Sequence, residues 1–236
     1  MNHSRRILAA TAALAAATSM SGCALFGIGP DGSTADPVAT AALAVQTRDD
    51  FNALASVDST LPTSGEANYS GFMAGVVKDT QFTGGNPTQI GRMLVGDANF
   101  EVAFMASDVD FSGTVSNILA KDETDQNEFY IALTSGTAAD VQALLETYDG
   151  TSGELTFTNG RLDTPVGTTK NITSNVSGTV THNGDAIEFG GTTRGYFIGA
   201  NGEGMFVNAE THEGLTIKEN GVDRFGDFGI RLVETN

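Results

Sequence analysis

From residue 67 onward, apolar and polar residues alternate in short segments that tight turns separate. Leu155 and Phe157, for example, alternate with polar neighbours, a pattern typical of strands with one packed face and one solvated face. Asn183-Gly184 and Asn201-Gly202 predict hairpin turns, because Asn-Gly readily adopts the positive φ angles that such turns need. We expect strands over about 67–78, 90–106 (a hairpin or one long bulged strand), 111–119, 127–134, 152–158, 172–182, 185–190, 192–200, 203–209 and 224–233.

Short strands with tight turns and few helices predict an antiparallel sandwich or barrel, and closure is favoured because it leaves no exposed sheet edge. We therefore expect a mainly β fold, a single antiparallel barrel of about eight strands with short helices. A transmembrane barrel is the competing interpretation. It is disfavoured because the outer positions of the later strands are Thr, Glu and Arg and the chain has no Trp, whereas such barrels carry an apolar outer band with aromatic girdles.

Two segments have the pattern of short helices. Residues 48–57 form the first, with Thr47 as its cap, although Val38 to Val45 is an alternative start. The second begins at Thr137, where Asp140 completes a capping box, and Gly150 is placed to end it. We expect this second helix to cover one end or side of the sheet.

The N-terminus has the pattern of a secretory signal. Arg5 and Arg6 give a basic start, and the following run from Ile7 to Met20 is shorter than the roughly 20 residues of a membrane-spanning helix. Met20-Ser21-Gly22-Cys23 then resembles the lipobox of bacterial lipoproteins. That resemblance implies cleavage before Cys23 and lipidation of its thiol, which with more than one acyl chain gives a stable anchor.

This interpretation divides the chain into three parts: a lipoprotein signal peptide (1–22), a lipid-anchored flexible tether (23–46) and a barrel domain with a short N-terminal helix (47–236). Ala24 follows the lipidation site, and by the same resemblance it favours delivery to the outer membrane.

Charge and cysteine content exclude several classes of partner and site. The chain carries 12 Lys+Arg against 29 Asp+Glu, a formal net charge of −17. Nucleic acid is therefore not expected as a partner, because phosphate binding needs clustered basic residues. A single Cys excludes an intrachain disulfide framework and a Cys-rich zinc site.

Two strand segments carry a family resemblance. They are residues 67–75 (ANYSGFMAG) and 195–206 (GYFIGANGEGMF), and residues 98–118 fit a hairpin between them. Together they resemble the lipoprotein β-barrel domain of the transferrin-binding protein B and factor H-binding protein type. The resemblance covers roughly 60–233 and implies an eight-stranded barrel in a binding role, linked in that group to iron or haem capture. The chain has room for one barrel and almost no handle, so transferrin binding does not carry over.

Few residues are candidates for a chemical role. His182 and His212 are possible metal or haem ligands, although they stand far apart without a spacing motif. His182 precedes a tight turn, so we expect its ring to be solvated. The acidic segment 122–128 is either a solvated hairpin loop or a Ca²⁺ site, and it lacks EF-hand spacing. Asp108 and Asp110 are a possible carboxylate pair that more simply flanks a turn. No catalytic residue, metal site or cofactor is predicted. Any exposed aromatic among Tyr69, Tyr130, Tyr148 and Tyr196 is a candidate for binding, although packing in the core or wall is the simpler role for each.

The sequence thus favours a non-enzymatic, monomeric outer-membrane lipoprotein, on the cell surface or the periplasmic face, that binds a protein or small solute. The alternative is a structural envelope lipoprotein with a filled barrel and no small ligand. A hydrolase is a third interpretation, disfavoured because no nucleophile, zinc or phosphate-loop motif is present in the sequence.

Overall fold

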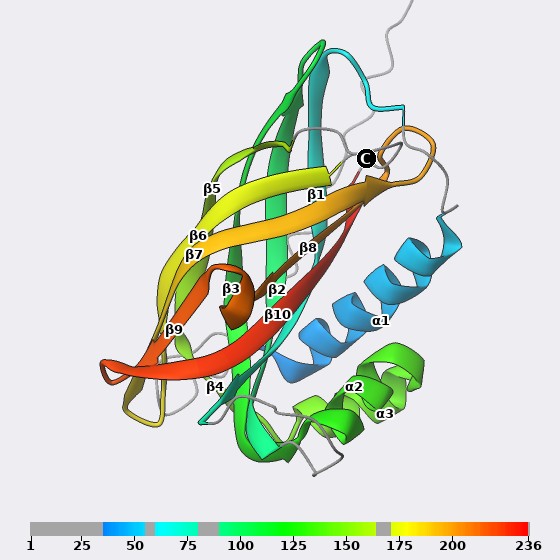
Figure 1. Cartoon of the computed structure of the whole chain (residues 1–236). Helices are drawn as coiled ribbons and strands as arrows, with labels where there is room; N and C mark the ends of the chain where they lie inside the picture. Colours follow the sequence, from blue (N-terminus) through cyan, green and yellow to red (C-terminus); the bar gives the residue numbers. More distant parts are fainter. Residues whose placement is uncertain (1–34, 55–59, 80–89, 164–170, 236) are drawn as a thin grey trace, which may run out of the picture.

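The strands of the computed structural model close into one antiparallel barrel (Figure 1). The structure describes residues 35–54, 60–79, 90–163 and 171–235. The described strands are β1 (Gly65–Lys78), β2 (Ile90–Phe104), β3 (Val109–Asp125), β4 (Asp149–Gly150), β5 (Ser152–Leu162), β6 (Asn171–His182), β7 (Asp185–Ile198), β8 (Gly204–Glu210), β9 (Leu215–Glu219) and β10 (Val222–Thr235).

Pairing between the first and last strands closes the barrel. β1 runs antiparallel to β10 from Asn68↔Thr235 to Lys78↔Phe225, and the remaining order is β2-β3-β5-β6-β7 and then β8. β8 and β9 both pair with β7 and β10, and the 3₁₀ turn η1 (Thr211–Glu213) separates them. They therefore share one position of the wall, and the predicted mainly β, eight-stranded antiparallel barrel is confirmed.

Side chains fill the interior of the barrel. Inward positions alternate along each strand, as Leu155 and Phe157 do on β5, and both are fully buried. Phe157 contacts Phe100 at 5.0 Å between ring centroids and meets Phe228 edge-on at 6.0 Å. The one inward tyrosine of β1, Tyr69, donates a hydrogen bond to the carbonyl of Gly202 at 2.6 Å. The interior is thus a packed core.

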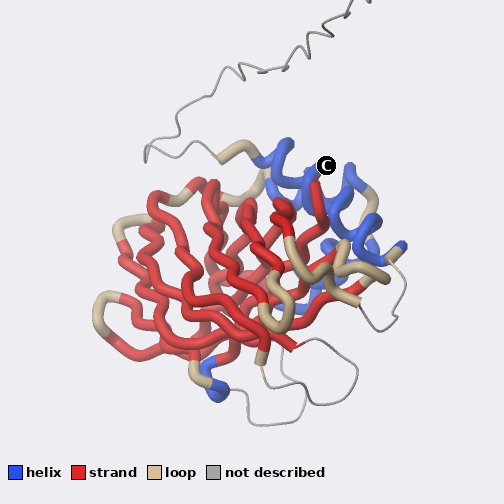
Figure 2. Tube along the Cα trace, turned by 90° about the horizontal axis from the view of Figure 1, so that it is seen from above, coloured by secondary structure: helices blue, strands red, loops and turns tan. Residues whose placement is uncertain are grey.

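Three helices form a second layer on the outside of one wall (Figure 2). They are α1 (Pro37–Ala53), α2 (Gln126–Ser135) and α3 (Ala138–Leu145). Their apolar side chains pack on outward residues of β1 and β2 such as Phe72 and Val95. β1 is consequently buried on both faces, because Met73 points into the barrel core while its neighbour Phe72 packs under the helices.

One arginine ties two of these helices together. The guanidinium of Arg48 on α1 donates to the carbonyl of Gly136 at 2.6 Å and to that of Leu133 at 3.4 Å. These carbonyls lie at the C-terminal end of α2, where the helix has no internal donors left for them. Arg48 therefore holds α1 against the end of α2.

The first helix begins earlier than the sequence pattern predicts. α1 starts at Pro37 with Asp36 as its cap, so the predicted start at Thr47 is wrong and the alternative at Val38 is the better one. A proline in the first turn suits a helix start, because its missing N–H has no partner there. The helix thus takes up residues that the prediction gave to the tether of 23–46.

A strand predicted at 127–134 is wrong, because these residues lie in α2. Asp125 accepts a hydrogen bond from the backbone of Asn127 at 2.9 Å and caps the helix. Phe129 and Leu133 are buried at helical spacing, while Ile131 between them is 65% exposed. The predicted acidic hairpin loop 122–128 is therefore wrong: residues 122–125 end β3 and residues 126–128 begin α2.

Other expectations are confirmed or refined. Thr137 and Asp140 form the predicted capping box of α3, but the helix ends at Leu145 and Gly150 lies in β4. The segment 90–106 is one long bulged strand, and the segments 185–190 and 192–200 are the single strand β7. β9 was not predicted.

The predicted signal peptide (1–22) and the predicted lipidation site Cys23 lie outside the described residues. None of the helices in the described part of the chain is long and apolar enough to cross a membrane.

Candidate functional site

Charged side chains close one end of the barrel interior. Arg92 lies two residues before the core residue Leu94 on β2, on the same inward face, and its side chain is 12% exposed. Its guanidinium donates to Asp122, to Asp185 at 3.1 Å and to Glu219. This charge cluster also contains His182 and Arg224.

His182 is a buried member of this charge cluster. The ring is 1% exposed, so the expectation that it is solvated is wrong. Its Nε2 lies 3.3 Å from Asp122 Oδ2, and its Nδ1 has no hydrogen-bond partner among the residues that the structure describes. Each carboxylate of the cluster faces an arginine or this ring. The cluster is therefore satisfied internally, and we assign it the structural role of closing the barrel end.

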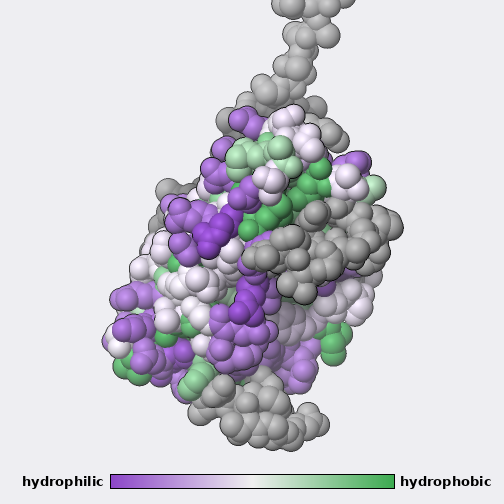
Figure 3. Space-filling view, turned by 45° about the horizontal axis from the view of Figure 1, so that its top comes forward, coloured by the Kyte–Doolittle hydropathy of each residue, from purple (hydrophilic) through white to green (hydrophobic). Residues whose placement is uncertain are grey.

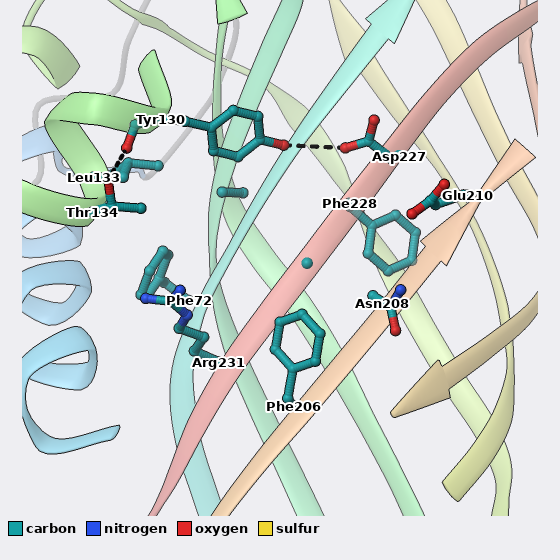
Figure 4. A pocket seen from close by; sticks show the side chains of 12 residues that line it. Phe72, Tyr130, Leu133, Thr134, Phe206, Asn208, Glu210, Asp227, Phe228 and Arg231 are labelled. Carbon is teal, nitrogen blue, oxygen red and sulfur yellow. Dashed lines mark hydrogen bonds between the residues drawn. The ribbon is translucent and has the colours of Figure 1, made fainter. Parts of the chain in front are cut away.

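A groove of about 250 Å³ opens on the outer wall beside α2 (Figure 4). It lies where α2 at the edge of the helix layer borders the outer faces of β8 and β10. Its lining is apolar at the floor and polar at the edges: Phe72, Ala74, Tyr130, Leu133, Thr134, Phe206, Asn208, Glu210, Asp227, Phe228, Gly229 and Arg231.

The groove owes its depth to a glycine. Gly229 lies on β10 where a side chain would point outward into the groove, and an added Cβ would meet only the ring edge of Phe206, at 3.4 Å. Phe206 is itself supported by Tyr196, with ring centroids 5.4 Å apart. The floor is therefore a stable apolar surface without a bulky residue at its centre.

Two carboxylates lie at one side of this groove. Tyr130 on α2 donates a hydrogen bond to Asp227 on β10 at 3.1 Å, and Glu210 lines the same side (Figure 4). Burial raises the pKa of Asp227, while the charges of Lys78 and His212 and the Tyr130 hydrogen bond oppose the rise. Burial and the charge of Asp227 raise the pKa of Tyr130 well above its usual value, so the hydroxyl stays a proton donor.

A guanidinium lies at the other side. Arg231 is four residues after Asp227 on the same face of β10, and its Cζ lies 5.8 Å from the ring centroid of Phe51 on α1. Among the described residues the Arg231 guanidinium has no ion pair or hydrogen bond. The groove thus separates negative from positive charge across an apolar floor.

The remaining predicted site residues are spread over the surface. His212 lies in η1, is 57% exposed and contacts Glu210 at 3.1 Å, so the two histidines belong to different clusters. Asp108 accepts hydrogen bonds from the backbone of Val109 and Leu162, both at 2.8 Å, and holds the turn before β3. Within the described residues no group of three or more His, Cys, Asp or Glu side chains is placed to hold a metal ion.

Of the four tyrosines predicted as candidates, two are packed and two border the groove. Tyr69 lies in the barrel core, and Tyr148 packs under the helices. Tyr130 lines the groove and Tyr196 supports its floor. Sequence reasoning missed Asp227, Arg231 and Gly229. The one available signal was Arg231 as a charged residue between Ile230 and Leu232, which placed it on the outer wall without showing what it faces.

No protein-family model, curated protein or solved structure matches this chain.

Proposed function

We propose that the chain is a non-enzymatic lipoprotein, anchored to the outer membrane through Cys23, and that the groove beside α2 is its ligand site. The observation that carries the proposal is the contrast between the barrel interior and the outer groove. The interior is filled by side chains, whereas the groove is open, apolar at its floor and lined by polar groups at its sides. Concave apolar sites with a few polar groups are the usual form of small-ligand sites.

The lipoprotein part of the proposal is supported by Met20-Ser21-Gly22-Cys23 after a short apolar run. The resemblance to transferrin-binding protein B-like barrels supports a binding role at the cell surface or the periplasmic face. Iron or haem as the ligand would follow only from that resemblance. The groove itself presents carboxylates, one guanidinium and aromatic rings.

The anchor is tested by fractionating cells that express the wild-type chain and Cys23→Ser. Wild type should sit in the membrane fraction and incorporate labelled palmitate, and the variant should lose both properties. Equal membrane retention and label in the two chains would contradict lipidation at Cys23.

The ligand site is tested by screening a fragment library against the domain in the lipid-free Cys23→Ser chain, with ligand-detected NMR. Fragments should bind wild type and lose binding in Gly229→Val, which fills the groove. Gly190→Val is the matched control, because Gly190 also lies on a strand but does not line the groove, and only the Thr216 hydroxyl is near its Cβ position. Binding that survives Gly229→Val would place the site elsewhere.

A structural envelope protein is the second candidate function, and the filled barrel interior favours it. It predicts that no fragment binds in the groove and that Gly229→Val changes nothing except stability. The same screen therefore separates the two functions.

A further inference from the structure

We infer that the groove takes a ligand with an ammonium group at one end, a carboxylate at the other and a short apolar body between them. Amino acids with distant charges and short peptides have this chemistry. The inference rests on the proposed ligand site and adds the class of ligand.

The ammonium end is assigned by the two carboxylates. Asp227 and Glu210 line the same side of the groove (Figure 4), and the Tyr130 hydroxyl donates to Oδ1 of Asp227 at 3.1 Å. Asp227 is withdrawn from water, so a cation that pairs with it gains more than at an open surface. His212 and Lys78 also act on this side. A ligand ammonium must therefore compete with these two side chains for the carboxylates, and the presence of two carboxylates, Asp227 and Glu210, favours its binding.

The carboxylate end is assigned by Arg231. Its guanidinium packs over Phe51 and is without an ion pair among the described residues, although the chain is strongly acidic. An arginine that lines a groove and has its donors unused is suited to a carboxylate, which accepts two parallel N–H bonds. By contrast, Arg92 at the barrel end has its donors occupied by three carboxylates.

The length of the ligand follows from the strand. Asp227 and Arg231 are four residues apart on β10, so their Cα atoms are roughly 13 Å apart. Their side chains reach into the groove and shorten this gap, but the two charges of an ordinary α-amino acid would not span it. Phe72, Phe206 and the open space at Gly229 form the apolar surface between them.

The volume sets an upper limit. At about 250 Å³ the groove is smaller than the roughly 300–1,000 Å³ of pockets that bury drug-sized molecules. It suits a ligand the size of a dipeptide or of an amino acid with a long side chain. Larger ligands would leave most of their surface outside.

Three probes of nearly equal length test the inference: 6-aminohexanoate with both charges, hexylamine with the ammonium alone and hexanoate with the carboxylate alone. Titration of the isotope-labelled Cys23→Ser chain, followed by NMR, gives the three dissociation constants. We expect 6-aminohexanoate to bind about tenfold more tightly than either single-charge probe, the gain of one charge-assisted contact.

Two variants test which residue binds each charged end of the ligand. Asp227→Asn should remove most of the advantage of 6-aminohexanoate over hexanoate and keep its advantage over hexylamine. Arg231→Gln should do the reverse. Gly190→Val, outside the groove, should leave all three dissociation constants unchanged.

Failure of the inference is distinct from failure of the proposed site. Equal affinities for the three probes, all lost in Gly229→Val, would overturn the charged-end assignment and leave the groove as a ligand site. Binding of 6-aminohexanoate that neither Asp227→Asn nor Arg231→Gln changes would also overturn it. If none of the probes binds while other fragments bind in the groove, the ligand class is wrong.

Discussion

The two faces of β1 are both buried, but they meet different kinds of cover. The inner face, with Tyr69 and Met73, is enclosed by the other strands and packs into a filled core. The outer face, with Phe72 and Ala74, is covered by helices whose layer ends beside β10. The difference shows where the described residues leave room for a ligand: side chains fill the core, whereas the edge of the helix layer leaves a groove with polar groups along its sides (Figure 4).

The face of the molecule in Figure 3 is largely hydrophilic, as the net charge of −17 suggests, and its apolar side chains form one patch near the upper middle and a few smaller ones. An apolar floor within such a surface is therefore a local feature, and this kind of feature commonly marks a binding site.

The largest effect is expected from emptying the inner core. Phe157→Ala removes a fully buried ring that packs against Phe100 and Phe228, and it should lower the free energy of unfolding by about 3–5 kcal/mol. Phe206→Ala in the groove removes a ring that is already half-buried and should cost less than about 1.5 kcal/mol. Urea denaturation measures both, and similar losses would contradict the contrast between core and groove.

Two glycines, Gly71 on β1 and Gly229 on β10, also differ in how much room the structure leaves beside them. A Cβ at Gly71 would lie 1.9 Å from the carbonyl oxygen of Arg231, whereas one at Gly229 would lie 3.4 Å from the Phe206 ring. Gly71→Ala should therefore destabilise the barrel by about 3 kcal/mol, and Gly229→Ala should change its stability by about 0.5 kcal/mol or less. Thermal unfolding monitored by circular dichroism checks both. A stable Gly71→Ala would mean that β1 and β10 are less tightly apposed than the structure shows.

Two arginines compare the closed barrel end with the open groove. Arg92→Met leaves Asp122, Asp185 and Glu219 without their shared partner. It should cost about 1–2 kcal/mol, because the first two carboxylates are partly exposed and solvent reduces the loss. Arg231→Met breaks no ion pair among the described residues and should cost less than about 0.5 kcal/mol. Chemical denaturation at low and high salt measures the pair; a larger loss for Arg231→Met would show that it is structural.

The smallest effect is a pH dependence at Asp227. Burial raises its pKa in the folded protein, so the folded state holds this proton more tightly than the unfolded state does. The stabilisation from this group is therefore complete below the ordinary Asp pKa and is lost as the pH rises through the raised value. Asp227→Asn does not titrate, and its stability relative to wild type should rise between about pH 4 and pH 7. A relative stability that falls over this range would contradict the burial of Asp227.

Local patterns allowed most of the barrel to be predicted from the sequence. Period-two alternation and turns such as Asn183-Gly184, where both residues have positive φ, place the strands because each signal is contained within a few residues. α2 was missed because Phe129, Ile131 and Leu133 also alternate at period two. The segment is a helix because Asp125 caps it through the backbone of Asn127 and because Phe129 and Leu133 pack together in the cluster of the helix layer.

The candidate site was beyond sequence reasoning for a different reason. Asp227 and Arg231 share a face of one strand, but their meaning depends on Tyr130 and Phe51, which two helices far away in the sequence bring to them. His182 was misplaced similarly, because only the closed barrel shows that the end of β6 faces Asp122. Contacts between distant segments, which local patterns do not encode, make the site.

Mapping where 6-aminohexanoate binds distinguishes the outer groove from the barrel core and the barrel end. Backbone amide and methyl NMR shifts of the labelled Cys23→Ser chain are recorded during titration. We predict that the largest shifts fall on the outer groove, at Gly229, Arg231 and Leu133, while the core methyls of Leu155 and Val176 stay unchanged. Shifts concentrated on those core methyls, or around Arg92 at the barrel end, would contradict the account.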